Sequence, residues 1–243
     1  MPRTLPPRLR AWPQRMPRTA ELRRAALALL LALGASGSGA HEIQAPPADF
    51  SAPAAGSYRL DRIYRVPEGA VVDVHGKAGT LRDHTRGRAT LLSLMYTQCN
   101  DEKGCPLALH TLDVVRKRLA ALPQARERVR LVSLSFDPAR DTPAVLRDYA
   151  GPRVRSLPAV PWRFLVPASE RSLHSLLEGF EQDVSRTEDA DGAAAPELSH
   201  VLKVFLIDRH GWVREIYSTS YLVPQVVIND VQTLLMEDGV RFR

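Results

Sequence analysis

The sequence predicts an α/β protein of three layers, in which helices cover both faces of a central mixed sheet. Two observations carry this prediction. Short apolar runs typical of buried strands, such as Leu91–Tyr96 and Val129–Phe136, alternate with segments whose apolar residues recur at a helical spacing. The composition, with 44% hydrophobic and 25% charged residues, is that of a chain able to bury a full core. The 243 residues therefore allow one folded domain with tails.

Residues 1–40 have the pattern of a targeting segment. They hold seven arginines and one acid, and the 11-residue apolar run 25–35 is followed by the small residues Ser38-Gly39-Ala40. Because a membrane span needs about 20 apolar residues, a cleaved signal peptide is favoured, while a short N-terminal anchor and a mitochondrial presequence stay open. We expect export to the periplasm, with membrane association through this segment as the alternative to cleavage.

The net charge of +6 is concentrated in these first residues. From His41 onward basic and acidic residues balance, and no basic stripe with interleaved aromatic residues is present in the sequence. We therefore expect no nucleic-acid partner. Residues 41–57, rich in Ala and Pro, are expected to be an extended linker, and residues 58–243 the folded domain.

The expected elements of residues 58–243 follow one another in a regular order. Strands are expected at Tyr58–Val66, Ala70–Val74, Leu91–Tyr96, Val129–Phe136, Trp162–Val166, 201–208 and 212–217, with a turn at His75–Gly79. Helices are expected from Pro106 to Leu122, from Thr142 to near Gly151, from Ser169 to about Phe180 and from Pro224 to about Met236. The acidic, Ala-rich segment 181–198 is expected to be a surface loop. A βαβ start followed by a β-hairpin and a terminal helix is the thioredoxin arrangement, here with insertions.

Both cysteines, Cys99 and Cys105, lie on the loop between a buried strand and a helix. Pro106 fits the first helical turn, so Cys105 is expected at or near the N-cap, where free N–H groups and the helix dipole favour a thiolate. Thiolates bind soft metals and attack disulfides. A purely structural disulfide is the alternative, but closing so short a loop gains little entropy. We therefore expect a functional pair.

Seven histidines are available as a third ligand: His41, His75, His84, His110, His174, His200 and His210. His200 stands out because it directly precedes the apolar run 201–208, whose start would face the cysteine loop in the thioredoxin arrangement. Two thiolates and one imidazole suit Cu(I), with Zn(II) as the competitor. His41 would become the mature N-terminus after cleavage at Ala40 and is a further candidate for binding Cu(II).

Four motifs stand out along the chain: Tyr96-Thr97-Gln98-Cys99, Cys105-Pro106, Asp137-Pro138-Ala139-Arg140-Asp141-Thr142-Pro143, and His200 before the apolar strand that ends Leu206-Ile207-Asp208-Arg209-His210-Gly211. In this order they resemble the motifs of the Sco/SenC copper-chaperone family. The likeness runs from about Thr80 to Met236. It implies a thioredoxin-like, exported or membrane-anchored protein that binds copper through Cys99, Cys105 and His200. The implied client is the subunit of cytochrome c oxidase that carries the copper A centre.

The resemblance leaves the role of the cysteine pair open. Some family members are better described as thiol-disulfide reductants of the client's cysteines, which would make Cys99 and Cys105 a redox-active pair able to form a disulfide. For Asp137 the resemblance implies at most a contact with the residues around the ligands or with a partner protein. We expect a monomeric metallochaperone rather than an enzyme, with a thiol-disulfide oxidoreductase as the alternative.

The sequence departs from the family pattern at two places. Five residues, 100–104, separate the cysteines, where the family has three, and Ser199 precedes His200, where the family usually has Asp. The longer loop can still bring both sulfurs to one ion, but it changes the chelate geometry. The chain therefore resembles a divergent branch whose client need not be cytochrome oxidase.

Overall fold

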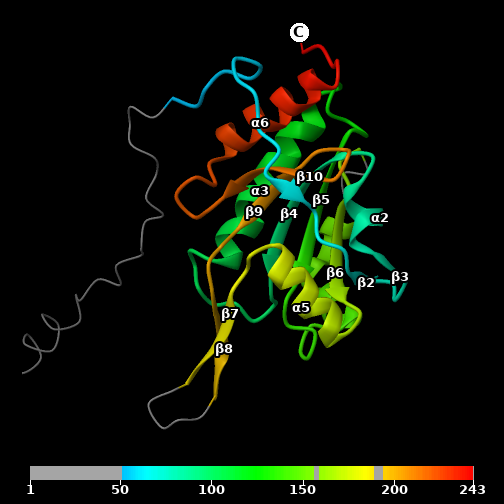
Figure 1. Ribbon diagram of the computed structural model, residues 1–243, viewed down its shortest axis with the longest axis vertical. Helices are drawn as coiled ribbons and strands as arrows, with labels where there is room; N and C mark the ends of the chain where they lie inside the picture. Colours follow the sequence, from blue (N-terminus) through cyan, green and yellow to red (C-terminus); the bar gives the residue numbers. More distant parts are fainter. Residues whose placement is uncertain (1–50, 156–158, 189–193, 243) are drawn as a thin grey trace, which may run out of the picture. The chain divides into compact units, whose positions relative to one another are not determined.

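The computed structural model describes residues 51–155, 159–188 and 194–242, which form an eight-stranded mixed sheet and a separate two-stranded hairpin (Figure 1). The strands of the large sheet, in spatial order, are β1 (Tyr64–Arg65), β10 (Trp212–Tyr217), β9 (Val204–Ile207), β4 (Ala89–Met95), β5 (Val129–Ser135), β6 (Trp162–Pro167), β2 (Ala70–Asp73) and β3 (Ala78–Thr80). The helices are α2 (Leu81–Thr85), α3 (Cys105–Ala121), α4 (Pro143–Ala150), α5 (Glu170–Gly179) and α6 (Pro224–Glu237), with a 3-10 turn at Gly151–Val154. The hairpin pairs β7 (Val184–Glu188) with β8 (Ala194–His200).

The centre of the large sheet is buried on both faces. β4, β5 and β6 run parallel, and β9 is antiparallel to β4. All seven residues of β4 and all seven of β5 are buried, as their near-continuous apolar runs predict. Because side chains alternate along a strand, each face must be covered by its own layer.

The strand register shows which helices cover which face. Leu91 of β4 pairs with Leu131 of β5, which pairs with Trp162 of β6, so these three side chains share a face. The guanidinium of Arg116 in α3 lies 5.8 Å from the centre of the Trp162 ring, which puts α3 on that face. Leu92 pairs with Phe205 on the opposite face, where Phe180 at the end of α5 packs against Phe205 with 4.7 Å between ring centres. The predicted three-layer α/β architecture is confirmed.

Local sequence signals set the helix starts as expected. The Thr142 hydroxyl accepts a hydrogen bond from the Val145 N–H at 3.3 Å, and the Ser169 hydroxyl accepts one from the Ser172 N–H at 3.2 Å. Proline occupies the first turn of α3, α4 and α6. α3 begins one residue before the predicted Pro106, with Gly104 as its N-cap.

The segment 181–198, expected to be a loop, is instead built mostly from the β7–β8 hairpin, with Val184 opposite His200. Its two strands pair only with each other, and their acidic, Ala-rich sequence lacks the apolar run that predicts a buried strand. His200 therefore ends β8 rather than opening the next strand, and residues 201–203 separate it from β9.

Two N-terminal predictions are also corrected. Of the strand expected at Tyr58–Val66, only Tyr64–Arg65 pairs, because the carbonyl groups of Leu60 and Asp61 accept hydrogen bonds from the side chain of Arg214 instead. The turn expected at His75–Gly79 includes the start of β3, which leads directly into the unpredicted helix α2.

The described part of the predicted linker lies along α6. The Asn229 side-chain amide donates to the Pro53 carbonyl at 2.7 Å, and the Gly56 N–H donates to the Thr233 hydroxyl at 2.9 Å. Where the linker begins stays a prediction. In the described ranges, none of the helices combines the length and the apolar character that crossing a membrane would require.

Candidate metal centre

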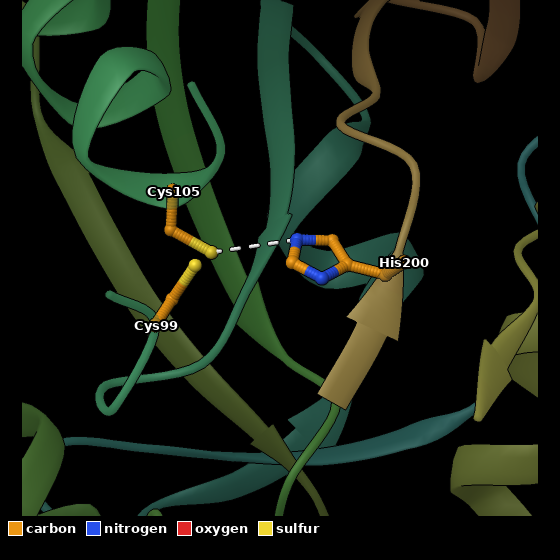
Figure 2. A group of neighbouring side chains, drawn as sticks. All are labelled: Cys99, Cys105 and His200. Atoms are coloured by element: carbon orange, nitrogen blue, oxygen red, sulfur yellow. Dashed lines mark hydrogen bonds between the residues drawn. The ribbon is translucent and has the colours of Figure 1, made fainter. Parts of the chain in front are cut away.

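The structure brings Cys99, Cys105 and His200 together at the carboxyl end of β4, as Figure 2 shows. Cys99 lies on the loop after β4, Cys105 is the first residue of α3, and His200 ends β8. The two sulfur atoms and one imidazole nitrogen all lie within 4.8 Å of one another. Among the described residues this is the one group of three or more His, Cys, Asp or Glu side chains close enough to share a metal ion.

Both cysteines of the cluster are shielded from solvent, whereas the histidine is partly exposed. Cys99 is 9% exposed and Cys105 is 2% exposed, so both thiols are buried. His200 is of intermediate exposure. An ion or a partner would therefore reach the cluster on the side of His200.

The orientation of the His200 ring fixes which nitrogen faces the sulfurs. Nδ1 lies 3.2 Å from the carbonyl oxygen of Leu198, and because a carbonyl only accepts, Nδ1 carries the proton. Nε2 is thereby left with a free lone pair, and it lies 3.7 Å from the sulfur of Cys105 (Figure 2). A backbone carbonyl that holds one ring nitrogen of a metal-binding histidine is a common way of setting its tautomer.

Two aromatic residues hold the imidazole in place. The Phe136 ring lies 4.9 Å from the His200 ring, and the Tyr96 ring meets it edge-on at 5.7 Å between centres. The Tyr96 hydroxyl also accepts a hydrogen bond from the Leu198 N–H at 3.2 Å, which ties β8 to the end of β4. The residue that supplies the nitrogen is thus braced against the segment that supplies the first sulfur.

The two thiols differ in acidity, and not in the direction that the sequence suggested. The hydrogen bond from the Cys105 thiol, aided by the backbone N–H groups of Cys105 and Asp101, lowers the pKa of Cys99 to about 6. Donating that hydrogen bond, together with burial and the charge on Cys99, raises the pKa of Cys105 above its ordinary value. The thiolate expected at Cys105 is therefore at Cys99. The first amide of helix α3 thus acts on the sulfur of the preceding loop as well as on the sulfur of its own residue, and the hydrogen bond between the two thiols decides which of them ionises.

Gly104 makes this placement of Cys99 sterically feasible. A Cβ atom at Gly104 would lie 3.2 Å from the Cys99 sulfur and 3.2 Å from the Asp101 carbonyl oxygen. The loop turns tightly here, since the Gly104 N–H donates to that same carbonyl at 2.8 Å. A side chain at this position would push the sulfur away from the N-terminus of α3.

Buried Asp141 fixes the segment that leads into Cys99. Its carboxylate accepts hydrogen bonds from the Thr97 N–H at 3.0 Å, from the Thr97 hydroxyl, and from the Ser135 hydroxyl at 2.6 Å. Asp141 is fully buried, so these donors replace the water that its charge would otherwise require. The carboxylate therefore joins the ends of β4 and β5 beneath the cysteines.

The neighbouring Asp137 is engaged in a different pair. Its carboxylate accepts from Arg140, whose guanidinium also donates to the Gln98 side chain at 3.0 Å and lies over the Tyr96 ring at 5.8 Å. Through Arg140, Asp137 is thus linked to Tyr96 and Gln98, which precede Cys99, and it lies outside the three-residue cluster.

Sequence reasoning found the three clustered residues and missed their supports. Tyr96, Asp141 and Phe136 all lie in segments singled out by their pattern, but none was assigned a role. A signal was present for two of them, since an aromatic residue ends each of the apolar runs at Leu91–Tyr96 and Val129–Phe136. His41 lies outside the described residues.

The donor set fits a soft metal ion. In the absence of a metal the cluster holds one thiolate, one thiol and an imidazole whose Nε2 faces the sulfurs. Metal–sulfur and metal–nitrogen bonds of about 2.0 to 2.3 Å place ligand atoms about 4 Å apart, so a small contraction would bring these atoms to bonding distance. Such an ion would replace the proton of Cys105. Two thiolates with an imidazole select Cu(I) or Zn(II) over hard cations.

The chain resembles known proteins along most of its length. Residues 70–236, which include all three clustered residues, match the family model described as SCO1/SenC. The copper-bound ScoI of Bradyrhizobium japonicum is 23% identical with a TM-score of 0.54, over 69% of this chain and 97% of that one. The copper-bound ScoI of Arabidopsis thaliana is 19% identical with a TM-score of 0.57, over 71% and 99%.

BsSco, described as a member of the Sco family of cytochrome c oxidase assembly proteins in which a disulfide switch was identified, also matches. It is 24% identical with a TM-score of 0.55, over 73% of this chain and 97% of that one. These likenesses show that the chain has the thioredoxin-like fold of those structures. A comparison with curated proteins gave no match.

Proposed function

The chain belongs to the SCO1/SenC family, and on that premise we propose that it is an exported copper chaperone. Cys99, Cys105 and His200 bind one copper ion, Cu(I) in the first place, and the protein delivers it to a cuproprotein. Support comes from the ligand cluster, from the family, and from the copper that two matching Sco structures hold.

The observation that carries the proposal is the arrangement around His200. Its Nδ1 is committed to the Leu198 carbonyl, so Nε2 is left to face the two sulfurs. A histidine that served only the core would need no such orientation toward two free thiols. The five-residue spacing between the cysteines is compatible with the cluster, because Gly104 lets the longer loop fold back onto the helix start.

Residues next to the cluster suggest where a client would make contact. Val201, which follows His200, is 62% exposed, and Tyr221 is 69% exposed. Thr219, two residues before Tyr221, donates to the carbonyl of Lys103 in the cysteine loop at 3.5 Å. Large exposed apolar side chains beside a shielded metal site suit a protein partner. BsSco is described as a cytochrome c oxidase assembly protein, so we propose a copper A type client for this chain as well.

A second candidate function is reduction of a disulfide in the client's metal site. It is favoured by the unequal thiols, with the pKa of Cys99 lowered to about 6 and that of Cys105 raised. The Cys99 thiolate would attack one sulfur of the client's disulfide, forming a mixed disulfide and releasing one client thiolate. Cys105 would then lose its proton and attack Cys99, which releases the second client thiol and leaves a Cys99–Cys105 disulfide. Two electrons pass to the client in this sequence.

An anaerobic Cu(I) titration tests the first function. The reduced chain should bind one equivalent tightly, and Cys105→Ser and His200→Ala should each weaken the binding by roughly a hundredfold or more, because each removes one of three ligands. His110→Ala is the matched control, since His110 is an exposed histidine on α3, and should bind like the wild type. Equal affinities for His200→Ala and the control would overturn the three-ligand site.

The reduction potential of the cysteine pair separates the two functions. His200→Ala removes a copper ligand but leaves both sulfurs, so the potential should change little while copper binding falls. A protein that binds no copper tightly, yet exchanges its disulfide readily with thiols, would establish the reductant instead.

The compartment is part of the proposal and has its own test. We propose periplasmic export directed by residues 1–40, because a free cysteine pair that handles copper or electrons operates outside the reducing cytosol. A reporter enzyme active only after export, fused behind residue 57, should be active. Deleting residues 1–40 from the fusion should abolish that activity.

A further inference from the structure

The end of the sheet opposite the metal centre bears a group of exposed arginines, which we call the arginine patch. It consists of Arg62, Arg65, Arg86, Arg209, His210 and Trp212, and these residues line a hollow of about 450 Å³. All four arginines and the histidine are exposed. We propose that the arginine patch binds the surface of a membrane rich in anionic phospholipids.

The position of the patch follows from the strand register. Arg86 lies just before β4, whereas Cys99 lies just after it. The turn that contains Arg209 and His210 joins β9 to β10, and Arg65 pairs with Trp212 at the start of β10. β4 has seven residues, so at about 3.3 Å per residue the two ends of the sheet are about 20 Å apart. In Figure 1 the hairpin that carries His200 and the β9–β10 turn lie at opposite ends of the sheet.

The patch carries excess positive charge. Within residues 51–155, 159–188 and 194–242, Arg209 pairs with Asp238 at 3.0 Å, but no carboxylate lies within 4.0 Å of a guanidinium nitrogen of Arg62, Arg65 or Arg86. Guanidinium groups bind phosphate oxygens in a bidentate manner, and each exposed cation near an anionic membrane adds to the attraction. Three arginines on one surface that lack a carboxylate partner therefore favour a phosphate-bearing partner.

Apolar side chains among these charges favour a membrane over a soluble anion. The Trp212 ring has the guanidinium of Arg65 at 4.1 Å and that of Arg62 at 5.6 Å from its centre. Ile63, between these two arginines in sequence, is 48% exposed. Tryptophan next to arginine is typical of the interface between lipid headgroups and acyl chains.

The path of the N-terminal segment agrees with this orientation. Residues 53–60 run along α6 and lead directly into Arg62 and Arg65. The sequence predicts that the preceding residues hold a cationic, apolar segment that is either cleaved or kept as an anchor. Binding through the arginine patch would direct the metal centre away from the membrane. It would also keep the protein at the membrane after cleavage of residues 1–40.

Vesicle co-sedimentation of the full chain tests the proposal. Wild type, the patch variant R62Q/R65Q/R86Q and the control variant R118Q/R147Q/R171Q are compared on vesicles of phosphatidylcholine with and without phosphatidylglycerol. Arg118, Arg147 and Arg171 are exposed arginines on α3, α4 and α5, so the control loses the same charge elsewhere. The N-terminal segment is identical in every protein, so any difference between the variants reports the substituted arginines.

We expect the patch variant to bind phosphatidylglycerol vesicles about a hundredfold more weakly than wild type, at about fivefold per arginine, and the control to stay within about threefold of wild type. The difference should shrink as salt rises and vanish on pure phosphatidylcholine. R62Q/R86Q keeps Arg65, whose guanidinium also donates to the His210 carbonyl at 2.9 Å, and should lose about twenty-five-fold without a change in folding.

Equal losses in the patch and control variants would overturn the proposal, because net charge alone would then explain binding. A titration with inorganic phosphate provides a second criterion. Phosphate binding that the patch variant loses, with no difference between the variants on vesicles, would assign the patch to a soluble anion instead. Neither outcome involves copper, so the test is independent of the proposed chaperone function.

Discussion

The two ends of strand β4 differ in how their charges are used. At the carboxyl end, Asp141 accepts three hydrogen bonds and Asp137 pairs with Arg140. At the amino end, Arg62 and Arg86 are exposed, and no carboxylate of the described chain lies within 4.0 Å of their guanidinium groups. A site for a small ion needs ligands held rigidly by satisfied neighbours, whereas a surface for an extended anionic partner needs charges left unsatisfied. The predictions below test this division.

The largest effect is expected from removing the carboxylate that organises the metal end. Asp141→Ala leaves the Thr97 N–H and the Thr97 and Ser135 hydroxyls without their acceptor, which should lower the free energy of unfolding by about 3 kcal/mol. Urea unfolding measures this change. The control Asp148→Ala, at an exposed position on α4, should change it by less than about 0.5 kcal/mol. Similar values for the two variants would show that Asp141 does not organise this end.

A smaller effect is expected from the residue that braces His200. Tyr96→Phe keeps the ring against the imidazole but removes the hydroxyl that accepts from the Leu198 N–H, so it should weaken Cu(I) binding about tenfold. A competition titration with a Cu(I) chelator measures the affinity. Tyr221→Phe, at a tyrosine that is 69% exposed, is the control and should bind like wild type. An unchanged affinity in Tyr96→Phe would mean that the brace does not position the ligand.

The acidity of the thiols gives a pH dependence with a defined sign. Since folding lowers the pKa of Cys99 from 9.0 to about 6, the folded metal-free protein binds fewer protons than the unfolded chain between these values. Its free energy of unfolding should therefore rise as the pH is raised from about 6 toward 9, and this contribution should be lost as the pH falls through about 6. Cys99→Ala should show a flatter dependence. The thiolate absorbance of Cys105→Ala should titrate at a higher pH than that of wild type, because Cys99 then lacks its principal donor.

The smallest effect is expected from changes at the opposite end of the sheet. R62Q/R86Q should alter the Cu(I) affinity by less than about twofold, because seven residues of β4 separate these positions from the cysteine loop. The same chelator competition measures it. A loss comparable to that of Tyr96→Phe would show that the two ends of the sheet are coupled.

Much of the fold was predictable because its signals are local. The apolar runs of β4 and β5, and the caps at Thr142 and Ser169, specify their elements within a few residues of sequence. α2 also had a local signal that was overlooked, since Asp83 accepts from the N–H and the hydroxyl of Thr80 in the manner of a capping box. The β7–β8 hairpin carries no comparable signal, because its sequence is acidic and rich in Ala and lacks the apolar run of a buried strand.

The sequence predicted which three side chains would lie together, but not the acidity of the two thiols. Cys99, Cys105 and His200 do cluster, although 95 residues separate Cys105 from His200 and His200 ends β8 instead of opening the next strand. Which thiol ionises depends on the hydrogen bond from Cys105 to Cys99 and on where the Cys99 sulfur lies relative to the first amide of α3, and the turn at Gly104 sets that position. The support from Asp141 depends equally on tertiary contacts, since it joins the ends of two strands.

X-ray absorption spectroscopy of the Cu(I)-loaded chain tests the three-ligand site most directly, because it reports the atoms bound to the ion. Wild type should show one copper with two sulfur ligands and one imidazole nitrogen, and His200→Ala should lose the nitrogen while keeping both sulfurs. A copper bound by sulfur alone in the wild type, or an imidazole signal that persists in His200→Ala, would contradict the assignment of Cys99, Cys105 and His200 as one copper site.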